Sequence, residues 1–309
     1  MDTIGIIGDL INNAYGRARR AWKVRDLKAY QALAISQTAQ GSDFLDVNID
    51  STRNMNVKLE EMLEFLPKLI PALQEVSSLP LCFDNPSLAF HKAAIEAYNF
   101  EKSPPPLINS IAASRKELDE IIALAGKYNA SILCIISEKF TKEGGSAPCE
   151  TAEESYETAK VFVKMLREKA ELKNDQIFLD PGLPPVGADT QGLVNMGLDA
   201  IKLIRADEDL KGVHISVGLS NFAWGTPKDL RPKLERAYLT IAGELGLDFS
   251  ISNPEHDPQP LDLNDELVIG LKNALNEGRP LEGETIDDSG FRQTTAILDL
   301  VTDDDDDDF

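Results

Sequence analysis

Aspartate and asparagine side chains close most of the short apolar runs in this sequence. Asp84 and Asn85 follow LPLCF, Asn109 ends PLIN, and Asp180 ends QIFLD. A carboxylate can accept two parallel hydrogen bonds from a planar ring that carries N–H groups, and an amide can both donate and accept. Such residues at strand ends therefore predict a site for a heterocycle such as a 2-amino-4-oxopyrimidine ring. The polar residues at or just beyond these ends are Asp9, Asn12, Asp46, Asn48, Asp50, Asp84, Asn85, Asn109, Ser110, Ser137, Glu138, Asp180, Ser220, Asn221 and Asn253.

Other site chemistries find less support in the sequence. A phosphorylated substrate would call for Lys or Arg and a glycine-rich anion nest after the seventh and eighth strands, and neither is present there. Lys139 and Lys142 lie in a polar loop, not in the apolar setting that a Schiff-base lysine requires. His91, His214 and His256 lack ligand spacing, so a zinc site is not predicted. A magnesium site built from the aspartates stays open.

The strand-end residues need a scaffold that brings them together, and the rest of the sequence has the pattern of one. Eight apolar, β-rich runs alternate with longer segments of helical period. This is the count and order of a (β/α)8 barrel, whose site forms at the carboxyl ends of its strands. A doubly wound sheet is the rival, but the first turn reads GDLINN, without GxGxxG. The runs span residues 4–8, 44–49, 79–83, 106–109, 131–136, 176–180, 213–218 and 249–252.

Capping residues mark several predicted helix starts. Thr151 with Glu154 has the pattern of a capping box, and so has Ser114 with Glu117. Thr226-Pro227 would place an N-cap and a first-turn proline before LRPKLER. Helix caps are also the structural alternative for any single strand-end residue, because βα loops commonly end in such residues. The convergence of many Asp and Asn residues favours a binding site over caps alone.

Composition and charge exclude some classes of function. The chain has 309 residues, of which 31 are Lys or Arg and 52 are Asp or Glu, giving a formal net charge of -21. This balance disfavours binding to nucleic acid or to anionic membranes. The N-terminus lacks the basic and apolar regions of a secretion signal, and no apolar run approaches the roughly 18 residues of a membrane span. We expect a cytoplasmic protein with a barrel at residues 1–277 and an acidic C-terminal extension at 278–309, which ends in Asp303–Asp308.

A series of short motifs resembles one known family. GDLINN, DFLDVNID, LPLCFDNPS, LINS, FLDPGLPPVG, VGLSN and ERAYLTIAGELGLDFSI follow one another over about residues 4–255. They resemble the pterin-binding barrel of the methyltetrahydrofolate:corrinoid methyltransferases. The resemblance implies a homodimer of (β/α)8 barrels without a metal of its own, which moves a methyl group between N5 of tetrahydrofolate and the cobalt of a corrinoid. Because the chain has no DxHxxG motif, the corrinoid is expected on a separate partner protein.

Matching motifs imply roles for individual residues. Asp84, Asn109 and Asp180 would hold the pterin ring, Gly218 would let the substrate approach the backbone, and Asn221 would hydrogen-bond N5. N5 of methylated folate is a poor leaving group unless electron density is drawn from it, so the transfer needs a positioned amide donor. The predicted catalytic residue is therefore Asn221. The predicted substrate-binding residues are Asp84, Asn109, Asp180, Gly218, Ser220, Asp46 and Asn48.

Departures from these motifs leave alternatives open. Trp224 stands where the family often has a glutamine, and the loop SEKFTKEGGSAP contains Gly144-Gly145, a candidate lid. The segment DVNIDSTRN is similar to the diphosphate loop of dihydropteroate synthase, but that family's basic groups on strand 7 and after strand 8 are replaced by GLSN and SNPEH. A folate-binding subunit without catalysis is a third interpretation. We favour formation of methyltetrahydrofolate during demethylation of a methylated substrate, because the glutamine and any aromatic-substrate domain are missing.

Overall fold

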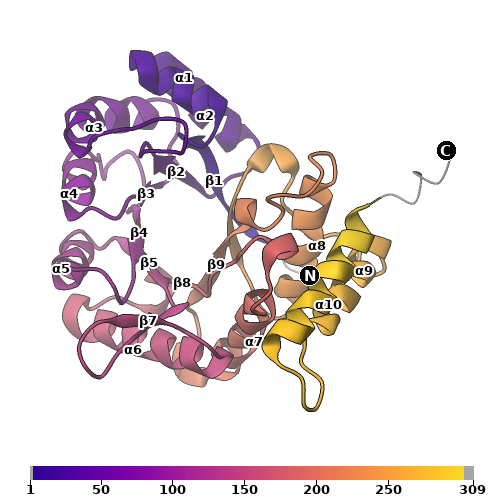
Figure 1. Cartoon of the computed structure of the whole chain (residues 1–309). Coiled ribbons are helices and arrows are strands. Elements are labelled where there is room, and N and C mark those ends of the chain that lie inside the picture. The colour runs from indigo at the N-terminus through magenta and orange to yellow at the C-terminus, as the bar shows by residue number, and fades with distance from the viewer. Residues whose placement is uncertain (1–2, 303–309) are drawn as a thin grey trace.

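Eight parallel strands form the centre of the molecule. The computed structural model describes residues 3–302, and its strands close into a barrel in the spatial order β1-β10-β9-β8-β5-β4-β3-β2. Helices surround this barrel as a ring (Figure 1), which confirms the predicted (β/α)8 fold. The barrel strands are β1 (Gly5–Asn12), β2 (Phe44–Asn48), β3 (Leu81–Asp84), β4 (Leu107–Ile111), β5 (Ser131–Ile135), β8 (Ile177–Asp180), β9 (His214–Gly218) and β10 (Phe249–Ser252).

Apolar side chains fill the inside of the barrel at the amino ends of its strands. Phe44, Phe178 and Phe249 meet edge to face, with ring centroids 5.0 to 6.1 Å apart. Gly5 makes room for them, since a Cβ on Gly5 would lie 2.4 Å from the Phe249 ring. Above the rings, Ile7 and other buried residues of the strands complete a separate inner core. This packed floor leaves only the carboxyl ends of the strands for a site.

Ten α-helices cover the outside of the barrel in the part of the chain that the structure describes. Their boundaries confirm one predicted cap, because Thr151 Oγ1 accepts a hydrogen bond from Glu154 N at the start of α6. Two predicted starts are wrong. The fifth helix begins at Leu118 because the Ser114 hydroxyl donates to Glu138 instead of capping, and the eighth begins at Arg231 because Thr226 Oγ1 donates to the carbonyl of Ala223. The helices are α1 (Gly16–Val24), α2 (Leu27–Ala39), α3 (Leu59–Gln74), α4 (Leu88–Glu96), α5 (Leu118–Tyr128), α6 (Ala152–Ala170), α7 (Leu193–Ala206), α8 (Arg231–Glu244), α9 (Glu266–Glu277) and α10 (Ile286–Val301).

A hairpin and five short 3-10 turns complete the elements of residues 3–302. The hairpin lies between β5 and α6, in the loop expected as a candidate lid, and pairs β6 (Glu138–Phe140) with β7 (Ser146–Pro148) in antiparallel register. Gly144 and Gly145 sit at its turn with φ values of 80° and 149°, which only glycine adopts readily. The 3-10 turns are η1 (Asn174–Gln176), η2 (Val186–Ala188), η3 (Glu208–Leu210), η4 (Leu219–Asn221) and η5 (Pro254–His256).

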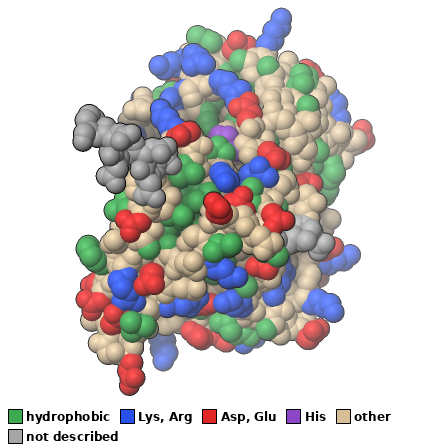
Figure 2. Space-filling view, turned by 90° about the vertical axis from the view of Figure 1, so that its right-hand side faces the viewer, with side chains coloured by type: hydrophobic (Ala, Val, Ile, Leu, Met, Phe, Trp, Pro, Cys, Tyr) green, Lys and Arg blue, Asp and Glu red, His purple; other side chains and the backbone are tan. Residues whose placement is uncertain are grey.

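Helix α10 packs against the body of the protein although it lies beyond the predicted end of the barrel domain. Its Ile297 is fully buried, and Gln293 donates to the backbone carbonyl of Asp189 over 3.1 Å. The aspartate run at 303–308 lies outside the described residues. Figure 2 shows this side of the molecule, where Lys and Arg side chains are mixed with Asp and Glu. No helix within residues 3–302 is both long and apolar enough to cross a membrane.

Candidate functional site at the carboxyl ends of the barrel strands

A layer of polar side chains lies directly above the apolar floor of the barrel. Strand register explains its composition, because residues paired across parallel strands point to the same face of the sheet. Asp46 pairs with Cys82, Asp84 pairs with Asn109, and Asp180 pairs with Ile135. Each of these residues either lies two positions after an apolar residue that points into the barrel, or ends its strand. The inward polar residues from the predicted set are therefore brought to one end of the barrel. They are Asp46, Asn48, Asp84, Asn109 and Asp180.

Asp46 and Asp84 form the acidic centre of this layer. Asp46 is fully buried, and neither of its carboxylate oxygens has a hydrogen-bond partner among residues 3–302. Burial raises the pKa of Asp46 well above its ordinary value, and the nearby charge of Asp84 raises it further. Burial also raises the pKa of Asp84 to about 6, against the effect of Asn48, whose Nδ2 donates to Asp84 Oδ2 over 2.8 Å. A buried acceptor without a donor is rare in a folded protein, so the Asp46 carboxyl is suited to a ligand that brings N–H groups.

Asp180 on β8 and Asn109 on β4 stand at the same rim, on the two strands that flank β5. The backbone N–H of Gly182 donates to Asp180 Oδ1 over 2.7 Å and orients the carboxyl. Burial raises the pKa of Asp180 to about 6, although this hydrogen bond acts in the opposite direction. Asn109 is 6% exposed, and its backbone carbonyl accepts from Asn85 N over 3.0 Å. These bonds fix both residues at the ends of β8 and β4.

The turn after β9 carries Asn221 beside Gly218. Leu219 and Phe222 anchor this turn in the core, where the Phe222 and Tyr238 rings pack with centroids 4.6 Å apart, while the Asn221 side chain is exposed. A Cβ on Gly218 would lie 3.0 Å from Asn221 Nδ2. Gly218 has φ -74° and ψ 79°, which other residues can adopt, so its glycine is needed for space and not for backbone freedom. The Asn221 amide lies beside this space, and the close approach of substrate to Gly218 stays a prediction.

A hydrogen-bonded group joins the turn after β9 to β1. The Ser220 hydroxyl donates to Asp9 Oδ2 over 2.8 Å, and the Tyr15 hydroxyl lies 3.0 Å from both Asp9 oxygens. Burial raises the pKa of Asp9 to about 6, while the two hydroxyl bonds oppose the rise. Tyr15 escaped sequence reasoning because it lies in the loop between β1 and α1, not at the end of an apolar run. Its only sequence signal is its position shortly after Asp9 and Asn12.

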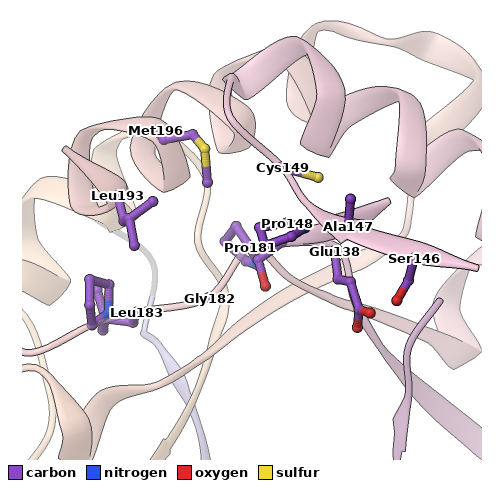
Figure 3. A pocket seen from close by; sticks show the side chains of 12 residues that line it. Glu138, Ser146, Ala147, Pro148, Cys149, Pro181, Gly182, Leu183, Leu193 and Met196 are labelled. Carbon is purple, nitrogen blue, oxygen red and sulfur yellow. The ribbon is translucent and has the colours of Figure 1, made fainter. Parts of the chain in front are cut away.

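A cavity of about 500 Å³ opens beside Asp180. It lies between the β6–β7 hairpin, the loop after β8, and α7, as Figure 3 shows. Leu183, Leu193 and Met196 make its wall largely apolar, while the Glu138 side chain lies on its hairpin side. This cavity could not be predicted from the sequence, since its lining residues come from three segments that only the fold brings together.

The comparison with known families decides what kind of barrel this is. The sequence model described as "Pterin binding enzyme" matches residues 11–251. The chain belongs to the pterin binding enzyme family. One curated relative of this pterin binding enzyme is the methylcorrinoid:tetrahydrofolate methyltransferase of Eubacterium limosum, 24% identical over 251 residues, which cover 81% of this chain and 84% of the relative. The predicted resemblance to the folate and corrinoid methyltransferases is confirmed, as is the prediction of a methyltransferase enzyme.

Solved structures of similar fold agree with the barrel of this pterin binding enzyme. The dihydropteroate synthase of Clostridium difficile superimposes with a TM-score of 0.58 at 18% identity, over 83% of this chain and 93% of that one. The 7,8-dihydropteroate synthase of Vibrio fischeri gives 0.57 at 16% identity, over 90% and 95%. At these identities the likeness shows the fold alone.

The charged residues of this pterin binding enzyme give no sign of a metal centre within residues 3–302. No group of three or more His, Cys, Asp and Glu side chains is placed there to hold an ion. His214 belongs to the opposite end of the barrel, where its ring lies 4.6 Å from that of Phe178 and its Nδ1 is 2.7 Å from Asp248. His256 is paired with Glu235 over 3.1 Å.

Proposed function

We propose that this protein transfers a methyl group between a corrinoid held by a separate protein and N5 of tetrahydrofolate, and that it forms methyltetrahydrofolate. One observation supports this most strongly: the buried carboxyl of Asp46 has no protein donor in the polar layer, and an exposed amide stands on the adjacent rim. A ring rich in N–H groups would satisfy the floor, and a reacting nitrogen would then meet the amide. The name of the Eubacterium limosum relative supports both the reaction and its direction.

The pterin ring would be held by the polar layer. We assign Asp84, Asn109 and Asp180 to its pyrimidine edge, and Asp46 and Asn48 to the supporting floor. Burial raises the pKa values of Asp46 and Asp84, so hydrogen bonds donated by the ring would favour their ionised forms. Binding would thereby relieve the cost of burying two neighbouring carboxyls.

Asn221 would act on N5. In the forward direction N5 takes the methyl group and loses its proton, while the electron pair of the broken carbon–cobalt bond stays on cobalt. The Asn221 amide can accept the N5 proton's hydrogen bond and so direct the N5 lone pair at the methyl carbon. In reverse, the same amide can donate to N5 as electron density builds there. Gly218 supports this role because a Cβ there would lie 3.0 Å from Asn221 Nδ2 and would push the amide from its present place.

Access of a second protein is provided by the open rim. Trp224 is 66% exposed and follows Asn221 in the same loop. Its backbone N–H donates to the backbone carbonyl of Asn221 over 3.1 Å. Exposed tryptophan is a frequent anchor of protein–protein contacts. We assign Trp224 to the docking surface for the corrinoid-bearing partner. A homodimer, a cytoplasmic location and the division at residue 277 remain predictions.

A direct assay tests the proposal. The purified protein is mixed with methylcob(III)alamin and tetrahydrofolate, and cob(I)alamin is followed by absorbance while methyltetrahydrofolate is measured by chromatography. We expect both products in equal amounts. Folate binding by calorimetry without either product would indicate the binding subunit. Condensation of a pterin diphosphate with p-aminobenzoate would indicate the synthase, and either result would refute the proposal.

A further inference from the structure

The turn that carries Asn221 is tied to the opposite end of the sequence. Ser220 precedes Asn221 in η4, and its hydroxyl donates to Asp9 Oδ2 of β1 over 2.8 Å. Tyr15 OH lies 3.0 Å from each Asp9 oxygen and 3.5 Å from Ser220 Oγ. The three side chains therefore form one closed group between β1, the loop after it, and the turn after β9.

The fold alone does not require a carboxyl at this position. Asp9 is 4% exposed, and an ionised carboxyl is costly to bury unless it accepts hydrogen bonds. The apolar residues Leu219 and Phe222 already hold the turn in the core. An apolar residue in place of Asp9 would pack there without that cost. The carboxyl at Asp9 is thus better explained by what it holds than by packing.

Through Ser220, the Asp9 carboxyl holds the backbone next to Asn221. The amide of Asn221 fits against Gly218 with little room to spare, since a single added Cβ would lie 3.0 Å from its nitrogen. A small rotation of η4 would therefore move the amide away from its place on the rim. Ser220 is the residue of η4 whose side chain reaches past β10 to β1, so it restrains that rotation.

We propose that Asp9 is a positioning residue for Asn221, acting through the Ser220 hydroxyl and supported by Tyr15. This inference rests on the proposed function, because it assigns Asn221 the central role in the transfer. It also gives Ser220 a different task from the substrate contact that the sequence predicts. Asp9 itself does not touch the reacting atoms.

Protonation should weaken this link. An ionised Asp9 accepts from both hydroxyls, whereas a protonated one must use one oxygen as a donor. The ionisable groups around it are Tyr15 from the first loop, Glu235 from α8 and His256 from η5, with Asp46 on β2. Glu235 raises and His256 lowers the pKa of Asp9, and burial, the largest cause, brings it to about 6. The link should hold at pH 7.5 and loosen as the pH falls through about 6.

The test compares S220A, D9N and Y15F with the wild type and with the control S250A, which removes a buried hydroxyl that lies near Ser252 in β10. In the methyl transfer assay we expect S220A and D9N to lower kcat about 10-fold or more, the scale of a sub-ångström misplacement, with the KM for folate changed less than about threefold. The part of the acid limb of kcat that comes from Asp9 should disappear in both variants, whereas the part from Asp84 and Asp180, whose pKa values burial also raises to about 6, should remain. The double variant should be no slower than the slower single variant, because the two residues act as one unit. Y15F should show a smaller loss, since Ser220 still reaches Asp9.

A second measurement is independent of catalysis. The side-chain amide signals of Asn221, assigned in NMR spectra by their loss in N221D, should shift with a midpoint near pH 6 in the wild type and in S250A, and not in S220A or D9N. Parallel losses of kcat, folate affinity and Tm in S220A, or a pH shift of the Asn221 signals that persists in both variants, would overturn the inference. If the wild type transfers no methyl group, the proposed function fails, and the NMR experiment still decides whether Asp9 positions Asn221.

Discussion

Replacement of Asn221 by alanine separates binding from chemistry more directly than any other change. The side chain is exposed, so its loss opens no internal cavity, and we expect the free energy of unfolding to change by less than about 0.5 kcal/mol. The residues that we propose to hold the pterin, Asp84, Asn109 and Asp180, are on other strands. The affinity for folate should therefore stay within about tenfold of the wild type.

The expected loss is in the rate. Removal of one preorganised donor typically costs about 2.7 to 4 kcal/mol, or about 10² to 10³ in kcat. The exposure of Asn221 favours the lower end of this range, because solvent competes with an exposed donor. We expect N221A to lower kcat for methyl transfer about 10²-fold. Single-turnover absorbance measurements with methylcob(III)alamin and saturating folate give the rate, and calorimetry gives the affinity.

Two further variants sharpen this comparison. G218A keeps the amide but adds a Cβ 3.0 Å from Asn221 Nδ2, so displacement of the amide should lower kcat about 10-fold. N264A is a control, because Asn264 lies in the loop before α9 and its side chain bonds Asp262. A wild-type rate in N221A, or a loss of affinity equal to the loss of rate, would refute the role of Asn221 at N5.

Three further predictions concern binding, stability and docking. Calorimetry should show that D84A and D180A each weaken folate binding by about 1 to 3 kcal/mol, because a polar edge of the ligand is left unpaired; affinity equal to N264A would contradict this. D46N should weaken folate binding but raise the Tm, and the rise should be larger at pH 7.5 than at pH 5. The Asp46 carboxyl ionises near about 3.9 in the unfolded chain, whereas burial raises its pKa in the folded protein. The wild type therefore loses stability as the pH rises above the pKa of the unfolded chain. A Tm gain that is equal or larger at pH 5 would show the opposite sign. W224A should raise the KM for the corrinoid-bearing protein about 10-fold, as loss of an interface anchor does, and leave folate affinity unchanged; an unchanged KM would place docking elsewhere.

The sequence was most informative where function depends on a strand and the residue that ends it. An apolar run buried on both faces forms a parallel strand wherever it occurs, and barrel closure brings the carboxyl ends of all such strands to one rim. For this reason Asp84, Asn109 and Asp180 could be expected at a common rim from the strand pattern, and the structure brings them to one rim of the barrel.

Predictions from local capping signals were less successful. The Thr151 cap formed, but Ser114 and Thr226 bond to other partners. A capping residue has several competing acceptors and donors of similar strength, and the choice among them depends on neighbours that are distant in sequence. Helix α10 and the β6–β7 hairpin likewise owe their form to the surfaces on which they pack.

The sequence by itself determined the barrel and its strand-end polar residues, because hydrophobic periodicity and strand-terminal residues are local properties, and its short motifs carried the resemblance to the family. Only the tertiary structure decided how Asn221 is held. The Asp9–Ser220 hydrogen bond joins residues 211 positions apart, and the fit of the Asn221 amide against Gly218 depends on the rotation of one turn. Contacts of this kind leave no periodic trace in a single sequence, since they are fixed by the three-dimensional closure of the barrel.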